Sequence, residues 1–261
     1  MYWNDLNTHL KRQYGCKVYK LALSSGCSCP NRDGTLGVRG CIFCDGAGAF
    51  AEAGDIPAQL AAARQRVSAK AGQGTKYIAY FQSFTNTYGD PAHLRKLFQA
   101  AIEPEDVAIL SIATRPDCLG PEISELLAEL NRVKPVWVEL GLQTIHPASA
   151  AYIRRGYDLP VFDAAVKRLK AIGVRVIVHQ ILGLPGETPE MMAQTSRYIG
   201  QAGADGVKLH LLHVLRNTDL AAEWQAGRVQ TLELPEYIAA LELCLQNLPP
   251  EVVIHRLTGD G

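Results

Sequence analysis

The run VWVEL at residues 136–140 is followed by the helical pattern PVFDAAVKRLKAI at residues 160–172 and by RVIVHQI at residues 175–181. Short β-branched runs separated by a helical segment are typical of parallel strands, because a parallel pair needs a crossover that is usually a helix. This stretch therefore predicts a β-α-β unit.

The same alternation continues on both sides of that unit. Four more strands are expected at residues 17–23, 76–82, 107–112 and 207–212, with helices near residues 56–71, 91–101, 121–133 and 189–201. Several of these helices have Pro in the first turn, where its missing N–H costs nothing. Six strands are too few for a closed eight-stranded barrel, so the sequence predicts an α/β fold, a partial (β/α)6 TIM-like barrel with a lateral cleft. Reactive side chains should follow the carboxyl ends of its strands.

The length of 261 residues fits one domain. We expect an N-terminal extension over residues 1–16, the barrel core over residues 17–213, and a C-terminal helix and strand within residues 219–261. The chain has no basic and apolar leader and no run of about 18 apolar residues, so a cytoplasmic protein without a membrane segment is expected. Its formal net charge is zero, which excludes an overall basic field but not a local basic face.

Four of the seven cysteines lie in one glycine-rich loop, which reads GCSCPNRDG at residues 26–34 and GVRGCIFC at residues 37–44. In a reducing compartment such thiols suit metal ligation better than disulfides. Thiolates bind zinc or iron–sulfur clusters, and both remain open from the loop alone, although Cys27 and Cys29 are awkwardly close for two ligands of one zinc. Burial as an inert thiol would account for Cys16 or Cys244, but it would not account for four cysteines in this loop.

The motif Cys29-x11-Cys41-x2-Cys44 resembles the cluster motif of the bacterial YhcC/YtqA radical S-adenosylmethionine (SAM) family, relatives of the elongator catalytic subunit. The resemblance implies that Cys29, Cys41 and Cys44 hold a [4Fe–4S] cluster whose open iron binds SAM. It also implies one-electron cleavage of SAM to a 5′-deoxyadenosyl radical that abstracts a substrate hydrogen, with an electron donor such as flavodoxin or ferredoxin. The protein's part is to orient SAM and to exclude water.

The resemblance extends to the later strand ends and assigns SAM contacts to polar groups there: Gln82, Ser83, Asn86, Ser111, Thr114, Arg115, Glu139, Gln143, Arg155, His179 and Gly183. Structural roles compete with several of these assignments. The loop after residue 82 also suits a helix cap at Asp90, Arg115 also suits a pair with Asp117, and residues 183–188 also suit a turn with a Thr188 cap. Arg155 also fits a surface charge and His179 a core histidine.

Three further residues are candidates for catalysis, namely Cys118, Lys208 and His210. The Cys118 thiol suits hydrogen-atom donation, but free cysteines are also often simply buried. Lys208 and His210 alternate onto one face of a strand and should point into the barrel. A buried lysine needs a partner, and Glu139, itself costly to bury alone, is the expected one.

The relation to the elongator subunit implies modification of the C5 side chain of a tRNA wobble uridine. Radical chemistry on a protein or small metabolite, a non-catalytic iron–sulfur redox protein and a zinc-stabilised RNA-binding module are the alternatives. Basic residues that suit phosphate contact, or simply a solvated surface, are Lys11, Arg12, Lys17, Lys20, Arg64, Arg66 and Lys70. Family members continue beyond Thr258, so a truncated chain is expected. The sequence shows no acetyltransferase half, so an acetyl-CoA-dependent reaction is not expected.

Overall fold

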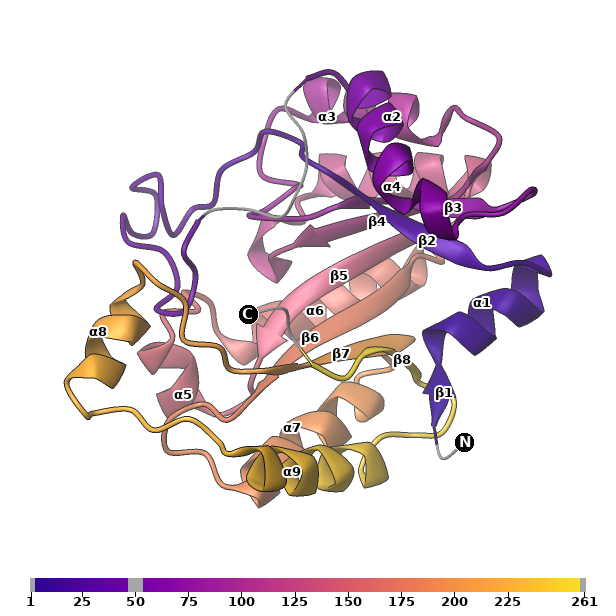
Figure 1. Cartoon of the computed structure of the whole chain (residues 1–261). Helices are drawn as coiled ribbons and strands as arrows, with labels where there is room; N and C mark the ends of the chain where they lie inside the picture. The colour runs from indigo at the N-terminus through magenta and orange to yellow at the C-terminus, as the bar shows by residue number, and fades with distance from the viewer. Residues whose placement is uncertain (1–2, 47–53, 259–261) are drawn as a thin grey trace.

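The computed structural model describes residues 3–46 and 54–258, and an open, curled parallel sheet organises them (Figure 1). The sheet has eight strands in the order β1-β8-β7-β6-β5-β4-β3-β2, and every neighbouring pair is parallel. The six central strands are β2 (Val18–Leu23), β3 (Lys76–Phe81), β4 (Val107–Thr114), β5 (Val136–Gln143), β6 (Arg175–Leu182) and β7 (Gly206–Leu211). All six lie where the sequence predicts them, and the partial α/β barrel is confirmed.

Two short strands extend the sheet beyond these six. The C-terminal strand expected within residues 219–261 is β8 (Val253–Arg256), which pairs with β7. It also pairs with β1 (Asn4–Asp5), which the sequence did not indicate because two residues carry no alternation. The six barrel strands and the C-terminal strand were thus predicted, and β1 is the strand of the described residues that was missed.

Helices cover the outer face of the sheet. The crossover helices are α2 (Ile56–Val67), α3 (Pro91–Ile102), α4 (Pro121–Val133), α6 (Leu159–Ala171) and α7 (Pro189–Gln201), and α9 (Leu234–Gln246) packs beside α7. Asp90 and Thr188 cap α3 and α7 as expected, each accepting a backbone N–H of the first turn. The short helices α5 (Pro147–Tyr152) and α8 (Asp219–Gln225) were not predicted.

The inside of the half-barrel is divided into an apolar and a polar half. Helix α1 (Leu6–Tyr14) lies across the amino ends of the strands and inserts Leu10 among Ile78, Ile109 and Trp137. Polar and charged side chains occupy the interior toward the carboxyl ends. The fold thus places one closed apolar floor beneath one open polar cavity.

Helices in the part of the chain that the structure describes are all too short or too polar to cross a bilayer. The chain end after Thr258, where truncation was expected, lies outside the described residues.

Candidate functional site

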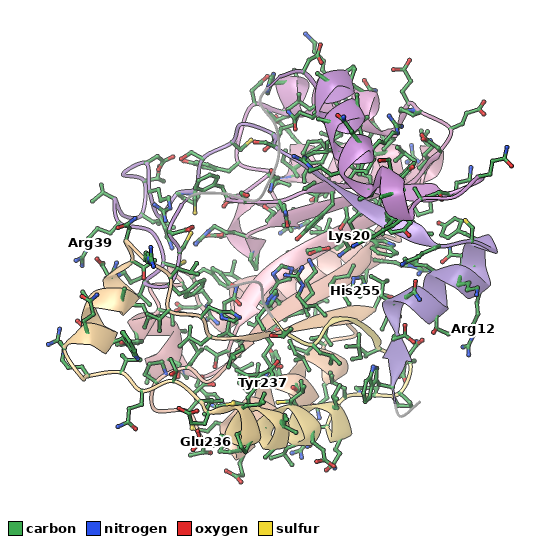
Figure 2. The ribbon with its side chains drawn as sticks, viewed as in Figure 1. Arg12, Lys20, Arg39, Glu236, Tyr237 and His255 are labelled. Carbon is green, nitrogen blue, oxygen red and sulfur yellow. The ribbon has the colours of Figure 1, made fainter. Side chains whose placement is uncertain are left out.

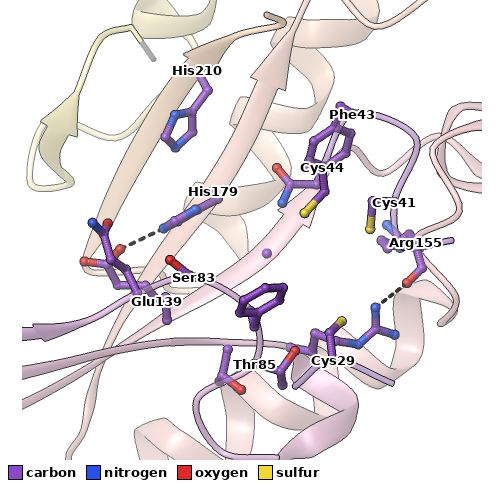
Figure 3. Close-up of a pocket in the computed structure, with 18 of the residues that line it drawn as sticks. Cys29, Cys41, Phe43, Cys44, Ser83, Thr85, Glu139, Arg155, His179 and His210 are labelled. Carbon is purple, nitrogen blue, oxygen red and sulfur yellow. Dashed lines mark hydrogen bonds and ion pairs between the residues drawn. The ribbon is translucent and has the colours of Figure 1, made fainter. Parts of the chain in front are cut away.

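The thiols of Cys29, Cys41 and Cys44 line one cavity of about 320 Å³ at the carboxyl ends of the strands. Figure 3 shows the three sulfur atoms toward one end of this cavity and Glu139, His179 and His210 toward the other. The cavity volume lies within the range typical of small-molecule sites. The loop that follows β2 therefore faces the interior polar groups of the barrel.

The cysteine loop is held by its own arginine and by the barrel. The Arg32 guanidinium donates to the Cys44 carbonyl at 2.5 Å. It lies 2.9 and 2.8 Å from where a Cβ at Gly40 or Gly46 would be, and both residues have φ of 73°, so a side chain at either position would be strained. Asn31 Nδ2 donates to the Arg154 carbonyl at 2.7 Å and lies 3.4 Å from Cys41 Sγ. These bonds hold the loop around Cys41 and Cys44 and tie it to Arg154.

The thiol arrangement fits a cluster better than a zinc ion. No group of three His, Cys, Asp or Glu side chains within residues 3–46 and 54–258 surrounds a single-ion position. In a [4Fe–4S] cluster each thiolate binds its own iron, and three thiols that line one cavity are a donor set that fits such a cluster. Burial raises the pKa of Cys41 to about 11, so this thiol needs a metal to stay deprotonated.

A buried carboxylate forms the other end of the cavity. Glu139 accepts from Ser111 Oγ at 2.9 Å and from His179 Nε2 at 2.8 Å. It also pairs with Lys208 and, at 3.5 Å, with Lys20. The Lys208–Glu139 pair predicted from the strand pattern is confirmed.

These contacts shift the pKa values of the ionisable side chains around Glu139. Burial alone would raise the pKa of Glu139, but Lys208, Lys20 and His179 hold it well below its ordinary value. Burial lowers the pKa of Lys208 to about 7, against the opposing effect of Glu139. Burial, with His179 and Lys208 adding to it, lowers the pKa of His210 to about 2, so this imidazole stays neutral. Its Nε2 is buried without a hydrogen-bond partner in the described chain.

Backbone strain marks two strand ends beside the cavity. Ser83 and Phe84 after β3 have φ of 70° and 58°, and Gln143 at the end of β5 has φ of 68°. Residues with side chains avoid this left-handed region unless the surroundings impose it, and such strain is concentrated at functional sites. All three line the cavity.

Two arginines close the cavity between the thiols and β5. Arg115 makes two hydrogen bonds to Asp117, at 2.9 and 2.7 Å. This is the pair that the sequence offered as an alternative to a SAM contact. Arg155 is only 5% exposed and donates to the carbonyls of Thr144 and Tyr157 at 2.6 and 3.0 Å. It pairs with no carboxylate among residues 3–46 and 54–258, so its charge is the less compensated of the two, and the surface-charge alternative is wrong.

The structure gathers most of the predicted residues around this cavity: Cys29, Cys41, Cys44, Gln82, Ser83, Thr114, Arg115, Glu139, Gln143, Arg155, His179, Lys208 and His210. Four others do not line it. Asn86 instead accepts from Ser25 Oγ and donates to two backbone carbonyls, and Ser111 is bonded to Glu139. Cys118 lies beside Asp117, and Gly183 packs against Leu232.

Other lining residues were missed, among them Tyr80, Thr85, Tyr157 and Arg256. Tyr80 accepts from Lys208 Nζ at 2.8 Å, and its position two residues before Gln82 in the predicted strand at residues 76–82 was the available signal. Thr85 Oγ1 is buried without a partner in the described chain. Its orientation depends on the strained turn, which the sequence does not reveal.

An open parallel α/β barrel with three thiols at the carboxyl end of its first long strand has the architecture of radical SAM enzymes. The family model for the Radical SAM superfamily matches residues 31–199, and that for the Radical_SAM C-terminal domain matches residues 204–261. The chain belongs to the radical SAM superfamily. Enzymes of this superfamily use SAM with an iron–sulfur cluster.

Several relatives resemble the chain over nearly its whole length. It is 41% identical to YtqA of Bacillus subtilis over 99% of this chain and 81% of that protein. It is 37% identical to YhcC of Escherichia coli over 99% of this chain and 84% of that protein. A solved structure of archaeal Elp3 from Methanocaldococcus infernus superposes with a TM-score of 0.71 at 19% identity, over 94% of this chain and 57% of that one. That likeness supports the fold.

Proposed function

We propose that this enzyme cleaves SAM at a [4Fe–4S] cluster held by Cys29, Cys41 and Cys44, and that it modifies the C5 side chain of a wobble uridine in tRNA. The observation that carries the proposal is the single cavity shared by three thiols and a buried polar network. When bound, SAM and the reduced cluster supply a 5′-deoxyadenosyl radical that abstracts hydrogen. The protein's residues bind SAM, orient it and shield it from water.

The side chains that line the cavity carry different charges on its different walls. Arg155, with its weakly compensated guanidinium, is suited to the SAM carboxylate, with Arg115 beside it. Gln82 after β3 and Gln143 at the strained end of β5 offer carbonyl acceptors for the SAM ammonium group. Ser83 and Thr114 also line the cavity. Glu139 and His179 form the polar wall opposite the thiols.

Lys208 and His210 are the groups that we assign to the substrate side. Lys208 is a buried amine whose pKa is lowered by burial, and His210 presents a neutral ring nitrogen without a partner in the described chain. Cys118 is left out of the proposed chemistry because its thiol lies beside Asp117, outside the lining of the cavity.

The tRNA assignment is supported by more distant relatives. The chain is 29% identical over 155 residues to a protein named tRNA uridine(34) acetyltransferase from Methanocaldococcus jannaschii, of which it covers 28%. The proposed electron donor is a small electron-transfer protein such as flavodoxin or ferredoxin.

The radical chemistry is tested by reconstituting the cluster anaerobically, adding dithionite and SAM, and measuring 5′-deoxyadenosine. Release of this product is expected, and its absence from fully loaded protein would refute the proposal. Alanine at Cys29, Cys41 or Cys44 should abolish cluster iron and sulfide. Cys27→Ala is the matched control, because Cys27 packs against the core and does not line the cavity. Loss of the cluster in Cys27→Ala but not in Cys29→Ala would show that the ligands are misassigned.

The substrate is tested separately by nucleoside mass spectrometry of tRNA from a strain that lacks the gene. We expect one wobble-uridine modification to disappear and to return with the wild-type gene. Unchanged wobble uridines would favour the alternative of a protein or metabolite substrate.

A further inference from the structure

Three cavities adjoin one another along the open edge of the barrel. The cavity that holds the thiols shares Arg256 with a second one of about 360 Å³, which lies between β2, β8 and α1. The second shares Trp3 and Asp5 with a third of about 480 Å³ beside α1. The row of adjoining cavities runs from the cavity with the thiols to the surface of the N-terminal segment, and is called here the edge path.

Cationic side chains flank the edge path at both ends. Lys20 on β2 pairs with Glu139 at 3.5 Å and still has 27% of its side chain exposed, and Arg256 lies across from it on β8. At the outer end is Arg12, and beside it lies the neutral ring of His9, whose pKa is lowered by burial and by Arg175 and Arg12. Arg175 Nη1 lies 3.3 Å from His9 Nε2. Figure 2 shows Lys20 and His255 between β2 and β8, and Arg12 on the outer side of α1.

Negative charge is scarce along this path. Asp5 is the one carboxylate among the described residues that line the second and third cavities. Its Oδ1 accepts from Thr8 N at 3.0 Å as the cap of α1, and its Oδ2 is buried without a hydrogen-bond partner in the described chain, so a cationic side chain of the path rather than a phosphate should face it. The path therefore complements an anionic chain.

An aromatic side chain lies where the second and third cavities meet. Trp3 is 37% exposed and lines both of them. An exposed indole between groups of cations has the composition of a site for single-stranded nucleic acid, where bases stack on aromatic rings and phosphates meet lysine and arginine.

We propose that the edge path binds the single-stranded loop of an RNA, with one base stacked on Trp3 and backbone phosphates at Lys20, Arg256 and Arg12. This rests on the proposed function, because it takes RNA as the substrate and directs it toward the cavity. The other basic group considered from the sequence is less suitable, since Arg64 on α2 already makes two bonds to Asp106 at 3.1 and 2.7 Å.

The test is fluorescence anisotropy with the cluster-loaded protein and a labelled RNA hairpin that has a uridine-containing loop. Trp3→Ala should weaken binding roughly 5- to 150-fold, the range found when a base loses its aromatic partner, and Trp3→Phe should largely retain it. Arg12→Ala should weaken binding and reduce the slope of log affinity against log salt by about 0.7, as expected for one phosphate contact.

Matched variants elsewhere on the surface provide the controls. Trp224→Ala removes an indole that is 50% exposed on α8, and Arg197→Ala removes an exposed arginine on α7. Both should bind the hairpin as the wild type does. The thermal midpoints of Trp3→Ala and Trp3→Phe show whether each remains folded.

The outcomes separate this inference from the proposed function. Unchanged binding by Trp3→Ala and Arg12→Ala, or equal losses in Trp224→Ala and Arg197→Ala, would overturn the edge path. A protein that releases 5′-deoxyadenosine but does not bind the hairpin would also overturn it, and would leave the radical chemistry intact. Hairpin binding that depends on Trp3, without 5′-deoxyadenosine release, would support the path and refute the proposed chemistry.

Discussion

Glu139 is a carboxylate in the middle of an apolar strand, and four side chains compensate it. It is 1% exposed and contacts Ser111, Lys20, His179 and Lys208. Transfer of such a charge out of water is costly, so the group persists only because its partners neutralise it. The same partners depend on Glu139, which makes the network sensitive to the loss of one member.

We predict that Glu139→Gln destabilises the protein by about 3–5 kcal/mol, because the substitution leaves Lys208 buried without its counter-charge. Urea denaturation measures the change in the free energy of unfolding. The matched control is Glu129→Gln, which removes the exposed pair with Arg95 and should cost about 1 kcal/mol or less. Equal losses in the two variants would show that the buried network does not carry this stability.

The lowered pKa of Glu139 predicts that the free energy of unfolding depends on pH. The folded pKa of Glu139 lies well below the value of 4.5 expected for the unfolded chain. Below pH 4.5 the unfolded state therefore binds a proton that the folded state resists, and the stability that Glu139 provides at higher pH is lost. The difference in unfolding free energy between wild type and Glu139→Gln should shrink as the pH falls from 4.5. A difference that stays constant over that range would contradict the assignment.

At the scale of elements, the contact between α7 and the segment after α9 depends on one glycine. Gly200 lies in the last turn of α7, and a Cβ there would be 2.3 Å from Pro249 Cδ. The proline ring is rigid and cannot rotate away. The glycine thus permits a close approach that an ordinary helix former would prevent.

Gly200→Ala should therefore lower the thermal midpoint although alanine is the better helix former. Helix propensity favours alanine by about 1 kcal/mol, whereas overpacking costs about 1–3 kcal/mol. Gln201→Ala, at the exposed next position, should change stability by no more than about 0.5 kcal/mol. An equal or higher midpoint for Gly200→Ala would indicate that Pro249 moves aside.

The central strands were predictable because each combines β-branched residues with a helical crossover. The Glu139–Lys208 pair was predictable too, since alternate residues of neighbouring strands face the same interior. The loops were not. Asn86 and Ser83 are both polar and follow the same strand, yet Asn86 braces the backbone while Ser83 lines the cavity. Which of the two side chains lines the cavity depends on the positive φ values of Ser83 and Phe84, and neither residue type favours such values.

At the scale of the whole molecule, α1 joins the two ends of an otherwise open barrel. The helix contacts both β2 and β8, and its Leu10 is 2% exposed within the apolar floor. The sequence suggested only an N-terminal extension, because the helix has only nine residues and its packing partners lie far along the chain.

We expect Leu10→Ala to cost about 2–5 kcal/mol, as for other buried leucines, because it leaves a cavity beneath Trp137 and Ile78. Chemical denaturation of the whole chain measures this loss. Lys11→Ala, at the exposed neighbouring position, should remain within about 0.5 kcal/mol of wild type. A small effect of Leu10→Ala would mean that the floor is stable without the helix.

The two-residue length of β1 has a consequence for how copies of this protein avoid one another. An unclosed sheet leaves two rows of unpaired backbone groups, which are templates for edge-to-edge aggregation. One edge ends on Asn4 and Asp5, too short to seat another chain. The other edge, β2, contains Lys20 and follows Lys17, and lysines on an edge disfavour pairing. The barrel remains open for its substrate while its edges discourage self-association.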